Sequence, residues 1–452
     1  MKKTPLVRYF AYACPDIGGQ LIFCVVSFYL LKFYTDVYGL SAATAGTILL
    51  VARCVDAVDA PVWGVIFDKT RSRWGKHRPW FLWLCVPFAL SGVAMFATPD
   101  LGPVAKVIYA GGTYMICSIL YTGINTPVTS ILVALTGDSR ERVVFTSFRM
   151  FGSKLGVLIV NLTMLKLVEI LGGGNDRKGF TLVLAIYAVC AVALFLFAFS
   201  KLEERQEEST KSVSILDGFR ALKTNWMWML VFASNLCFWI AFVARISVAP
   251  YFWEYTMHRK DLVGMANSLD FVSLIGIFLL PWLVRLSSKH TVWLLSLAGS
   301  VAAQFLVWQG VAQQSVPVVM AGWIAGVIAS GVAMAIPFSV LSDCVDYGEW
   351  KTGVRAAGLL TAVGAAFCLK AGGGIGGALP AWILDWSGYV PNVEQTSRAL
   401  GGIDLGFIWL PAAFYLLAAV PVFFYRRFER LESQVRQELE LRRQGAVVSA
   451  SA

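Results

Sequence analysis

The chain has 452 residues, of which 57% are hydrophobic and only 15% are charged, and its formal net charge is +10. Soluble chains contain about 45–50% apolar and about 25% charged residues, so this composition excludes an ordinary soluble protein and indicates a membrane protein. Apolar runs recur along the whole length, which also excludes a soluble domain with a single anchor. We attribute the positive charge to membrane topology rather than to nucleic-acid binding.

Twelve segments are long and apolar enough to cross a bilayer, which needs roughly 20 such residues per helix. In chain order they cover residues 10–33, 43–67, 80–98, 105–135, 150–171, 180–200, 225–250, 262–284, 291–312, 316–341, 357–387 and 404–425. A polar segment separates two sets of six. We therefore expect an all-α membrane protein with an N-terminal bundle (1–200), a cytoplasmic linker (201–224), a C-terminal bundle (225–426) and a tail helix (427–452).

Basic residues mark one side of the membrane as cytoplasmic. They concentrate in loops such as "FDKTRSRWGKHRPW" and in the linker, whereas the loops assigned to the other side hold few: Arg177, Lys178, Arg259, Lys260 and Arg398. This asymmetry predicts a multi-pass protein of the bacterial inner membrane with both termini in the cytoplasm.

The two halves echo one another. The loop "LTGDSRERVVFTSFR" after the fourth span has a counterpart in "LSDCVDYGEWKTGVR" after the tenth. Each begins with an acid, Asp138 or Asp343, and closes with an arginine, Arg149 or Arg355. Two duplicated six-helix bundles with a central site are a common plan for transporters, and a membrane enzyme has no need of it.

The tail predicts a cytoplasmic or interfacial helix without chemistry of its own. Its apolar face would comprise Phe428, Leu431, Val435 and Leu439. Favourable pairs four residues apart would join Glu432 with Arg436 and Glu438 with Arg442.

Neither the cysteines nor the histidines suggest a metal centre or a catalytic group. The nine cysteines are scattered without a CxxC motif and are typical of small buried hydrophobes. His77, His258 and His290 stand beside other charges in expected loops. The glycine run "KAGGGIGGALP" lacks a Walker pattern and indicates close helix packing. We expect no enzyme activity and no cofactor.

Charged residues inside the spans are the main functional signal, because each costs a few kcal/mol or more and usually faces a cavity or a partner. They are Asp16, Arg53, Asp56, Asp59, Arg149, Lys154, Arg245, Asp270 and Lys370.

Asp56 and Asp59 share one helical face, with Arg53 one turn before Asp56. Two close carboxylates in a low dielectric need compensation by a proton, a Na⁺ ion or a basic group, as a coupling-ion site requires. The alternative is an Arg53–Asp56 pair that only locks helices together.

Other polar residues in the spans suit a sugar, which proteins hold through charged or amide groups and aromatic rings. This set comprises Asp16, Gln20, Tyr121, Thr122, Asn125, Arg149 and Lys370.

The chain resembles the glycoside–pentoside–hexuronide:cation symporters, the melibiose permease branch of the major facilitator superfamily. The resemblance covers nearly the whole chain and rests on an ordered set of motifs: "YLLKFYTDVYGL", "VARCVDAVDAPVWGVIFDKTRSRWGKHRPW", "SDCVDYGEWKTGVRAAG", "LKAGGGIGG" and "GYVPNVEQ". It implies the major facilitator fold and cation-coupled sugar import by alternating access.

The resemblance also implies roles for individual residues. Asp16 and Arg149 match sugar-contacting residues, Asp56 a cation-site carboxylate, Thr122 a cation-site hydroxyl, and Lys370 a lysine near both sites. Asp59 matches an asparagine of the permease's cation site, so that any bound Na⁺ would lie at Asp56, Asp59 and Thr122.

Three positions depart from the family pattern. Ala60 stands where the second carboxylate is usual, and the acid is instead Asp59. Asn125 replaces a sugar-binding aspartate of the melibiose permease, and Thr129 replaces a tryptophan. The coupling ion therefore stays open between H⁺ and Na⁺, and galactoside specificity is not implied.

Lys154, with Arg245 and Lys370, would make the cavity positive and suited to an acidic sugar such as a uronide or a sulfonated sugar. The alternative is that Lys154 and Lys370 compensate the acids of the first half.

We predict a monomeric symporter for a sugar, glycoside or sugar acid, with H⁺ or Na⁺ as coupling ion. Cytoplasmic gating networks would comprise Asp68 and Arg71 in the first half, and Asp343, Asp346, Glu349 and Arg355 in the second. The alternatives are a lysolipid or other amphiphile carrier of the same fold and an uncoupled sugar facilitator.

Overall fold

The structure is a computed structural model that describes residues 5–136, 139–204, 225–353, 360, 362–435 and 437–441. These residues form helices and connections, with no strand among them. The α-helices and the shorter π or 3₁₀ helices (η) are α1 (Leu6–Lys32), η1 (Phe33–Val37), α2 (Ala42–Lys69), α3 (Pro79–Met95), α4 (Pro103–Leu135), α5 (Ser139–Gly172), α6 (Asp176–Lys201), α8 (Trp226–Tyr251), η2 (Phe252–Thr256), α9 (Leu262–Ser268), η3 (Leu269–Val272), α10 (Ser273–Leu286), α11 (Lys289–Ala312), α12 (Val316–Thr352), η4 (Ala362–Phe367), α14 (Cys368–Ser387), α15 (Ser397–Asp404), η5 (Leu405–Trp409) and α16 (Leu410–Glu429).

Where their residues are described, the predicted spans coincide with helices or successions of helices in this order, and residues 357–359 and 361 of the eleventh span lie outside the described part of the chain. Among the described residues, ten helical segments are long and apolar enough to cross a membrane, and Pro79–Met95 is a shorter apolar helix. The prediction of an all-helical membrane fold is confirmed.

The chain divides into two compact units that do not coincide with its two sequence halves. Unit 1 comprises residues 1–209, 246–271 and 377–404, and unit 2 comprises 210–245, 272–376 and 405–452. The division into bundles at residues 200 and 225 therefore stays a prediction.

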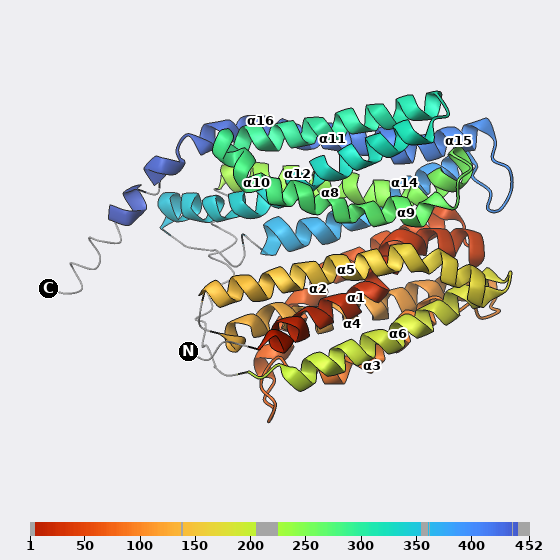
Figure 1. Ribbon diagram of the computed structural model, residues 1–452, viewed down its shortest axis with the longest axis horizontal. Helices are drawn as coiled ribbons and strands as arrows, with labels where there is room; N and C mark the ends of the chain where they lie inside the picture. Colours follow the sequence, from red (N-terminus) through yellow and green to blue (C-terminus); the bar gives the residue numbers. More distant parts are fainter. Residues whose placement is uncertain are drawn as a thin grey trace. The chain divides into compact units, whose positions relative to one another are not determined.

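In unit 1, α1 packs against α5 and α6, while α3 packs against α4 and α6, and α2 lies on α4 (Figure 1). Glycines allow α5 to approach α1 closely: a Cβ on Gly152 would lie 2.9 Å from the Ala13 carbonyl oxygen, and one on Gly156 would lie 3.1 Å from that of Ile17. Close approach at small residues is the usual way in which helices associate in lipid. It fixes the register between the polar residues of α1 and those of α5.

In unit 2, α11 packs against α12 and α16, and α10 packs against α12. The core is aromatic and aliphatic, with Trp293, Tyr415 and Tyr425 almost fully buried. The predicted close packing of the glycine run is confirmed here, because Cβ atoms on Gly372 and Gly376 would lie 2.5 Å from the Trp239 Cβ and 2.6 Å from the Ile240 carbonyl oxygen.

Local sequence signals set several helix ends. The side chains of Ser41, Asn175 and Ser288 accept hydrogen bonds from backbone N–H groups three residues later and so cap α2, α6 and α11. Gly353 ends α12 with a φ of +74°, a left-handed conformation that favours glycine.

Three predictions about loops are wrong. The segment after the fourth span is helical from Ser139, where α5 begins, and the segment after the tenth span is helical because α12 continues beyond its apolar run to Thr352. Contacts hold this extension, since Asp343 pairs with Lys289 and the Trp350 indole donates to Glu438. His290 is likewise buried in the first turn of α11 rather than placed in a loop.

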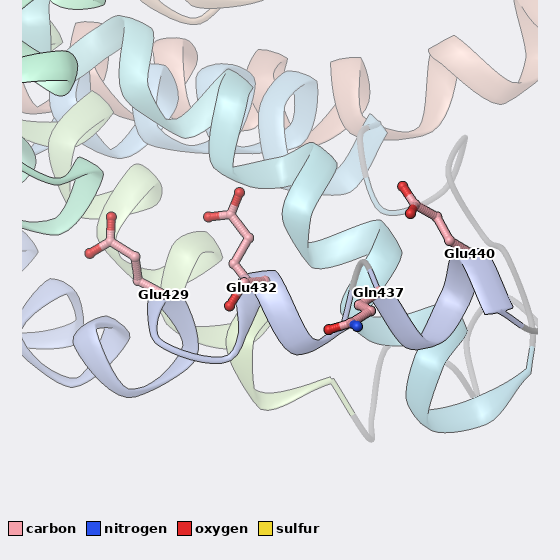
Figure 2. Close-up of a pocket in the computed structure, with 5 residues that line it drawn as sticks. Glu429, Glu432, Gln437 and Glu440 are labelled. Carbon is pink, nitrogen blue, oxygen red and sulfur yellow. The ribbon is translucent and has the colours of Figure 1, made fainter.

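The tail packs its apolar face as predicted, with Val435 and Leu439 buried and Phe428 edge-on to Tyr347. Arg436 and Arg442 lie outside the described residues, so the predicted pairs with Glu432 and Glu438 stay predictions. Glu432 pairs with Lys289 at 3.0 Å. Figure 2 shows three tail carboxylates pointing to the same side of a pocket of about 470 Å³. Its lining residues, Glu429, Glu432, Ser433, Gln437 and Glu440, include none of the predicted sugar or cation ligands.

Candidate functional site

Asp16 and Arg149 form an ion pair between α1 and α5. The Arg149 Nε donates to the Asp16 carboxylate at 2.8 Å, and a terminal guanidinium nitrogen donates to the Thr129 hydroxyl of α4, also at 2.8 Å. The Asp16 side chain is 9% exposed and that of Arg149 is 22% exposed, so that the arginine keeps an accessible edge. Charged groups held in this way can accept and donate hydrogen bonds to hydroxyl groups of a solute.

The neighbouring sugar candidates lie on the same three helices. The Gln20 amide donates to the Ser153 hydroxyl at 3.1 Å, which joins α1 to α5. Tyr121 stacks on Phe23 with ring centroids 4.4 Å apart and an interplanar angle of 8°. Asn125 lies one turn after Tyr121 in α4 and is partly buried. The structure therefore pairs Asp16 with Arg149 and places Gln20, Tyr121 and Asn125 on the same three helices of unit 1.

The predicted coupling site lies between α2 and α4. Asp56 is 1% exposed and accepts from Arg53 at 3.2 Å and from the Ser118 hydroxyl at 2.6 Å. Asp59 and Thr122 are also buried, at 7% and 8% exposure. The sequence analysis did not identify Ser118 as a hydrogen-bond partner of Asp56. Its position one turn before Thr122 in α4 places it on the same helix face as that candidate and could have indicated it.

Arg53 connects the coupling site to the sugar candidates. Its guanidinium lies 5.4 Å from the centroid of the Phe23 ring, and Phe23 in turn stacks on Tyr121. Phe23 belongs to α1, one turn after Gln20. A contiguous set of packed side chains thus joins the two groups of charges.

Lys154 pairs with an acid that the sequence analysis did not assign to it. Its ammonium lies 2.7 Å from a carboxylate oxygen of Asp270 in η3, and both residues belong to unit 1. The positive charge of Lys154 is thus balanced by an acid. This acid, Asp270, belongs to the second half of the sequence, whereas the alternative given above named acids of the first half. The partners are 116 positions apart in the sequence, which explains why no local pattern indicated the pair.

A second charge cluster that the sequence analysis missed lies at the end of α1. The Lys32 ammonium binds Asp36 at 2.6 Å and also Glu254 of η2, and it lies over the rings of Tyr251 and Tyr255. The Tyr389 hydroxyl donates to Asp36 at 2.8 Å. Within unit 1, this cluster joins residues from both halves of the sequence.

Arg245 and Lys370 lie in unit 2. Arg245 is 3% exposed, and its guanidinium lies 4.9 Å from the centroid of the Trp323 ring, a cation–π contact. Lys370 lies in the first turn of α14 and is partly buried.

The gating candidates have separate outcomes. In unit 2, Asp343 is buried and binds Lys289 at 2.6 Å, while Asp346 and Glu349 follow it on α12 and are partly buried. Arg71 is exposed in the loop after α2. The Asp68 side chain and all of Arg355 lie outside the described part of the chain.

Buried ion pairs on membrane-spanning helices are the feature that defines this class of protein. Removing one partner of such a pair leaves an uncompensated charge, so proteins keep these groups mainly along substrate and ion pathways. An all-helical, multi-pass architecture with charges of this kind is that of a membrane transporter.

The chain belongs to a family described as MFS/sugar transport protein, whose model matches residues 11–427. It is 38% identical over 441 residues to the isoprimeverose transporter of Lactiplantibacillus pentosus, covering 97% of this chain and 92% of the relative. It is 29% identical over 445 residues to a glucuronide carrier protein homolog of Escherichia coli, covering 96% and 95%. The crystal structure of a D-xylose-proton symporter superposes with a TM-score of 0.67 at 15% identity and covers 93% of this chain and 97% of that one, which shows the fold alone.

These findings confirm the predicted family and the major facilitator fold. The chain is a sugar or glycoside symporter and not an enzyme.

Proposed function

We propose that this symporter imports a glycoside across the bacterial inner membrane together with H⁺ or Na⁺, with both termini in the cytoplasm. Asp16, Gln20, Tyr121, Asn125 and Arg149 bind the sugar, whereas Asp56, Asp59 and Thr122 bind the coupling ion. Arg245 and Lys370 stay candidate sugar ligands on the sequence alone. Isoprimeverose, the sugar named for the 38% identical relative, is the first substrate to test.

The observation that carries the proposal is the contact chain from Asp56 through Arg53 and Phe23 to Tyr121. A cation at Asp56 competes with Arg53 for the carboxylate, and a displaced Arg53 moves against the ring on which Tyr121 stacks. Because coupling free energies are reciprocal, a sugar that orders Tyr121 also favours cation binding at Asp56.

Acidic groups of the second unit supply the cytoplasmic gate in this proposal. Asp343 is bound by Lys289, which also binds Glu432 of the tail, so that one lysine ties α12, α11 and the tail together. Asp346 and Glu349 follow on the same helix, and Asp68 and Arg71 take the corresponding role in the first half. Opening toward the cytoplasm requires these pairs to exchange partners.

Asp56→Asn tests the proposal because it removes the charge and keeps the size of the side chain. In proteoliposomes, we expect the variant to lose cation-driven accumulation of isoprimeverose while it retains exchange of labelled for unlabelled sugar. Asp100→Asn, at a fully exposed side chain, is the matched control and should behave as the wild type. Cation-driven accumulation that persists in Asp56→Asn would exclude Asp56 as the coupling carboxylate.

A further inference from the structure

We propose that Asp270 is a specificity-determining residue that makes this transporter select uncharged glycosides and reject uronides and sulfonated sugars. The inference rests on the proposed function and names the substrate class of the same site. The relatives named above include carriers named for isoprimeverose, which is uncharged, and for a glucuronide, which is anionic, so that charge is a property on which members of this family differ.

The first step concerns access. The side chains of Lys154 and Asp270 are 17% and 16% exposed, compared with 12% and 3% for Lys32 and Asp36. Both side chains of the Lys154–Asp270 pair are therefore partly accessible, and that of Asp270 is more accessible than that of Asp36. A solute that reaches the pair meets an ammonium and a carboxylate held 2.7 Å apart.

The second step is position along α5. Lys154 follows Arg149 by five residues, a rise of about 7.5 Å along a helix, and Ser153 between them binds Gln20. Five residues also turn the helix by about 140°, so the link from the pair to the proposed sugar ligands is Ser153, the neighbour of Lys154, which binds Gln20. Arg149 and Asp16 hold one end of this stretch, and Lys154 and Asp270 hold the other.

The third step is rigidity. Asp270 lies in the 3₁₀ segment η3, directly after α9. α9 lies in close backbone contact with α5, because a Cβ on Gly264 would lie only 2.4 Å from the Asn161 carbonyl oxygen. This close backbone contact places Asp270 opposite Lys154 before any substrate arrives.

The fourth step is charge. Lys154, Arg149 and Arg53 each have a carboxylate within 3.2 Å, in Asp270, Asp16 and Asp56. Sugar hydroxyls both donate and accept, so an uncharged glycoside can bond to either member of the Lys154–Asp270 pair. An anionic group that approaches Lys154 instead meets the carboxylate of Asp270, and two like charges in contact are strongly disfavoured.

The experiment compares uptake by proteoliposomes of isoprimeverose and of the aldonic acid made by oxidising its reducing end, together with matched pairs of aryl glycosides and aryl uronides. We expect the wild type to take up the uncharged members and to discriminate against the anionic ones. Asp270→Asn should reduce this discrimination by roughly tenfold or more, because it exposes the charge of Lys154. Asp261→Asn, in an exposed loop of the same unit, is the matched control and should leave the ratio unchanged.

The double variant Lys154→Gln/Asp270→Asn keeps the site neutral and guards against misfolding of the single variant. It should restore discrimination against anions, since no uncompensated ammonium remains. Preferred uptake of anions by the wild type, or an unchanged ratio in Asp270→Asn, would overturn the assignment of Asp270. A wild type that takes up no sugar of the panel would instead overturn the proposed function itself.

Discussion

Arg149 is the residue on which three helices converge. It belongs to α5, donates to Asp16 of α1 and to Thr129 of α4, and keeps about a fifth of its side chain exposed. The planar guanidinium can hold two partners in fixed directions, which a lysine ammonium cannot do. In the proposed sugar site, the geometry of the guanidinium, rather than its charge alone, would therefore orient a sugar.

Arg149→Lys separates geometry from charge. The variant retains a cation beside Asp16, so we expect it to fold with nearly unchanged thermal stability. Its affinity for isoprimeverose should fall by roughly tenfold or more, because the fork that orients the sugar is lost. Sugar-dependent thermal stabilisation in detergent measures this, with Arg177→Lys at a half-exposed arginine as the control. Unchanged affinity would remove Arg149 from the sugar site.

At this scale, the sequence indicated the charged residues but not all of their partners. Arg53 and Asp56 lie one turn apart, so that helical spacing alone predicted their contact. Lys154 and Asp270 are far apart in the chain and meet only through packing of α5 on α9. Asp36 and Glu254 were not recognised as partners of Lys32, because each lies near the end of a predicted span, where an acidic residue is common.

At the scale of elements, the start of α3 depends on a residue from another part of the chain. The Glu204 carboxylate, which follows α6, accepts from the backbone N–H groups of Lys76, His77 and Arg78 at 2.8, 2.7 and 2.6 Å. These groups precede Pro79, the first residue of α3, and would otherwise lack partners. A carboxylate at this end of a helix also complements its dipole.

Glu204→Ala should therefore destabilise the fold without touching the sugar or cation ligands. Loss of these hydrogen bonds is expected to cost about 1–2 kcal/mol of stability. Thermal unfolding in detergent would report it as a lower Tm, with Glu204→Gln between the wild type and the alanine variant. Glu203→Ala is the neighbouring control, since that side chain is exposed. Equal Tm values for Glu203→Ala and Glu204→Ala would contradict the capping role.

Hydropathy predicted where helices occur but not where they break or how far they extend. The eighth predicted span is interrupted by η3, and the twelfth begins with the π-helix η5 between α15 and α16. Such breaks arise from packing of neighbouring helices, which the residue order alone does not reveal. The extension of α12 to Thr352 was missed because polar residues end an apolar run but do not end a helix.

At the scale of the whole molecule, both halves of the sequence contribute to unit 1, and their contacts gather around the end of α1. Asn392 donates to the Asp36 carbonyl oxygen at 2.9 Å, and Thr35 shares a hydrogen bond of 2.8 Å with Tyr251. Nearby, a Cβ on Gly46 of α2 would lie 2.6 Å from the Ala381 Cβ. For alternating access, contacts of this kind must form and separate in each cycle, and Lys32 pairs with one acid from each half of the sequence, Asp36 and Glu254.

Lys32→Gln should loosen this end of the molecule. Its removal leaves Asp36 and Glu254 facing each other, and losing one partner of a buried ion pair costs about 3–5 kcal/mol. We expect faster hydrogen–deuterium exchange in residues 33–40 and 251–257. We also expect slower sugar accumulation, because the variant less often occupies the conformation in which the contacts around Lys32 are formed. Lys260→Gln is the control: its ammonium lies 3.5 Å from Glu254, but its side chain is 59% exposed. If exchange in both segments matched the wild type, Lys32 would be a passive packing residue, and closure of this end would depend on the glycine contacts of α2 instead.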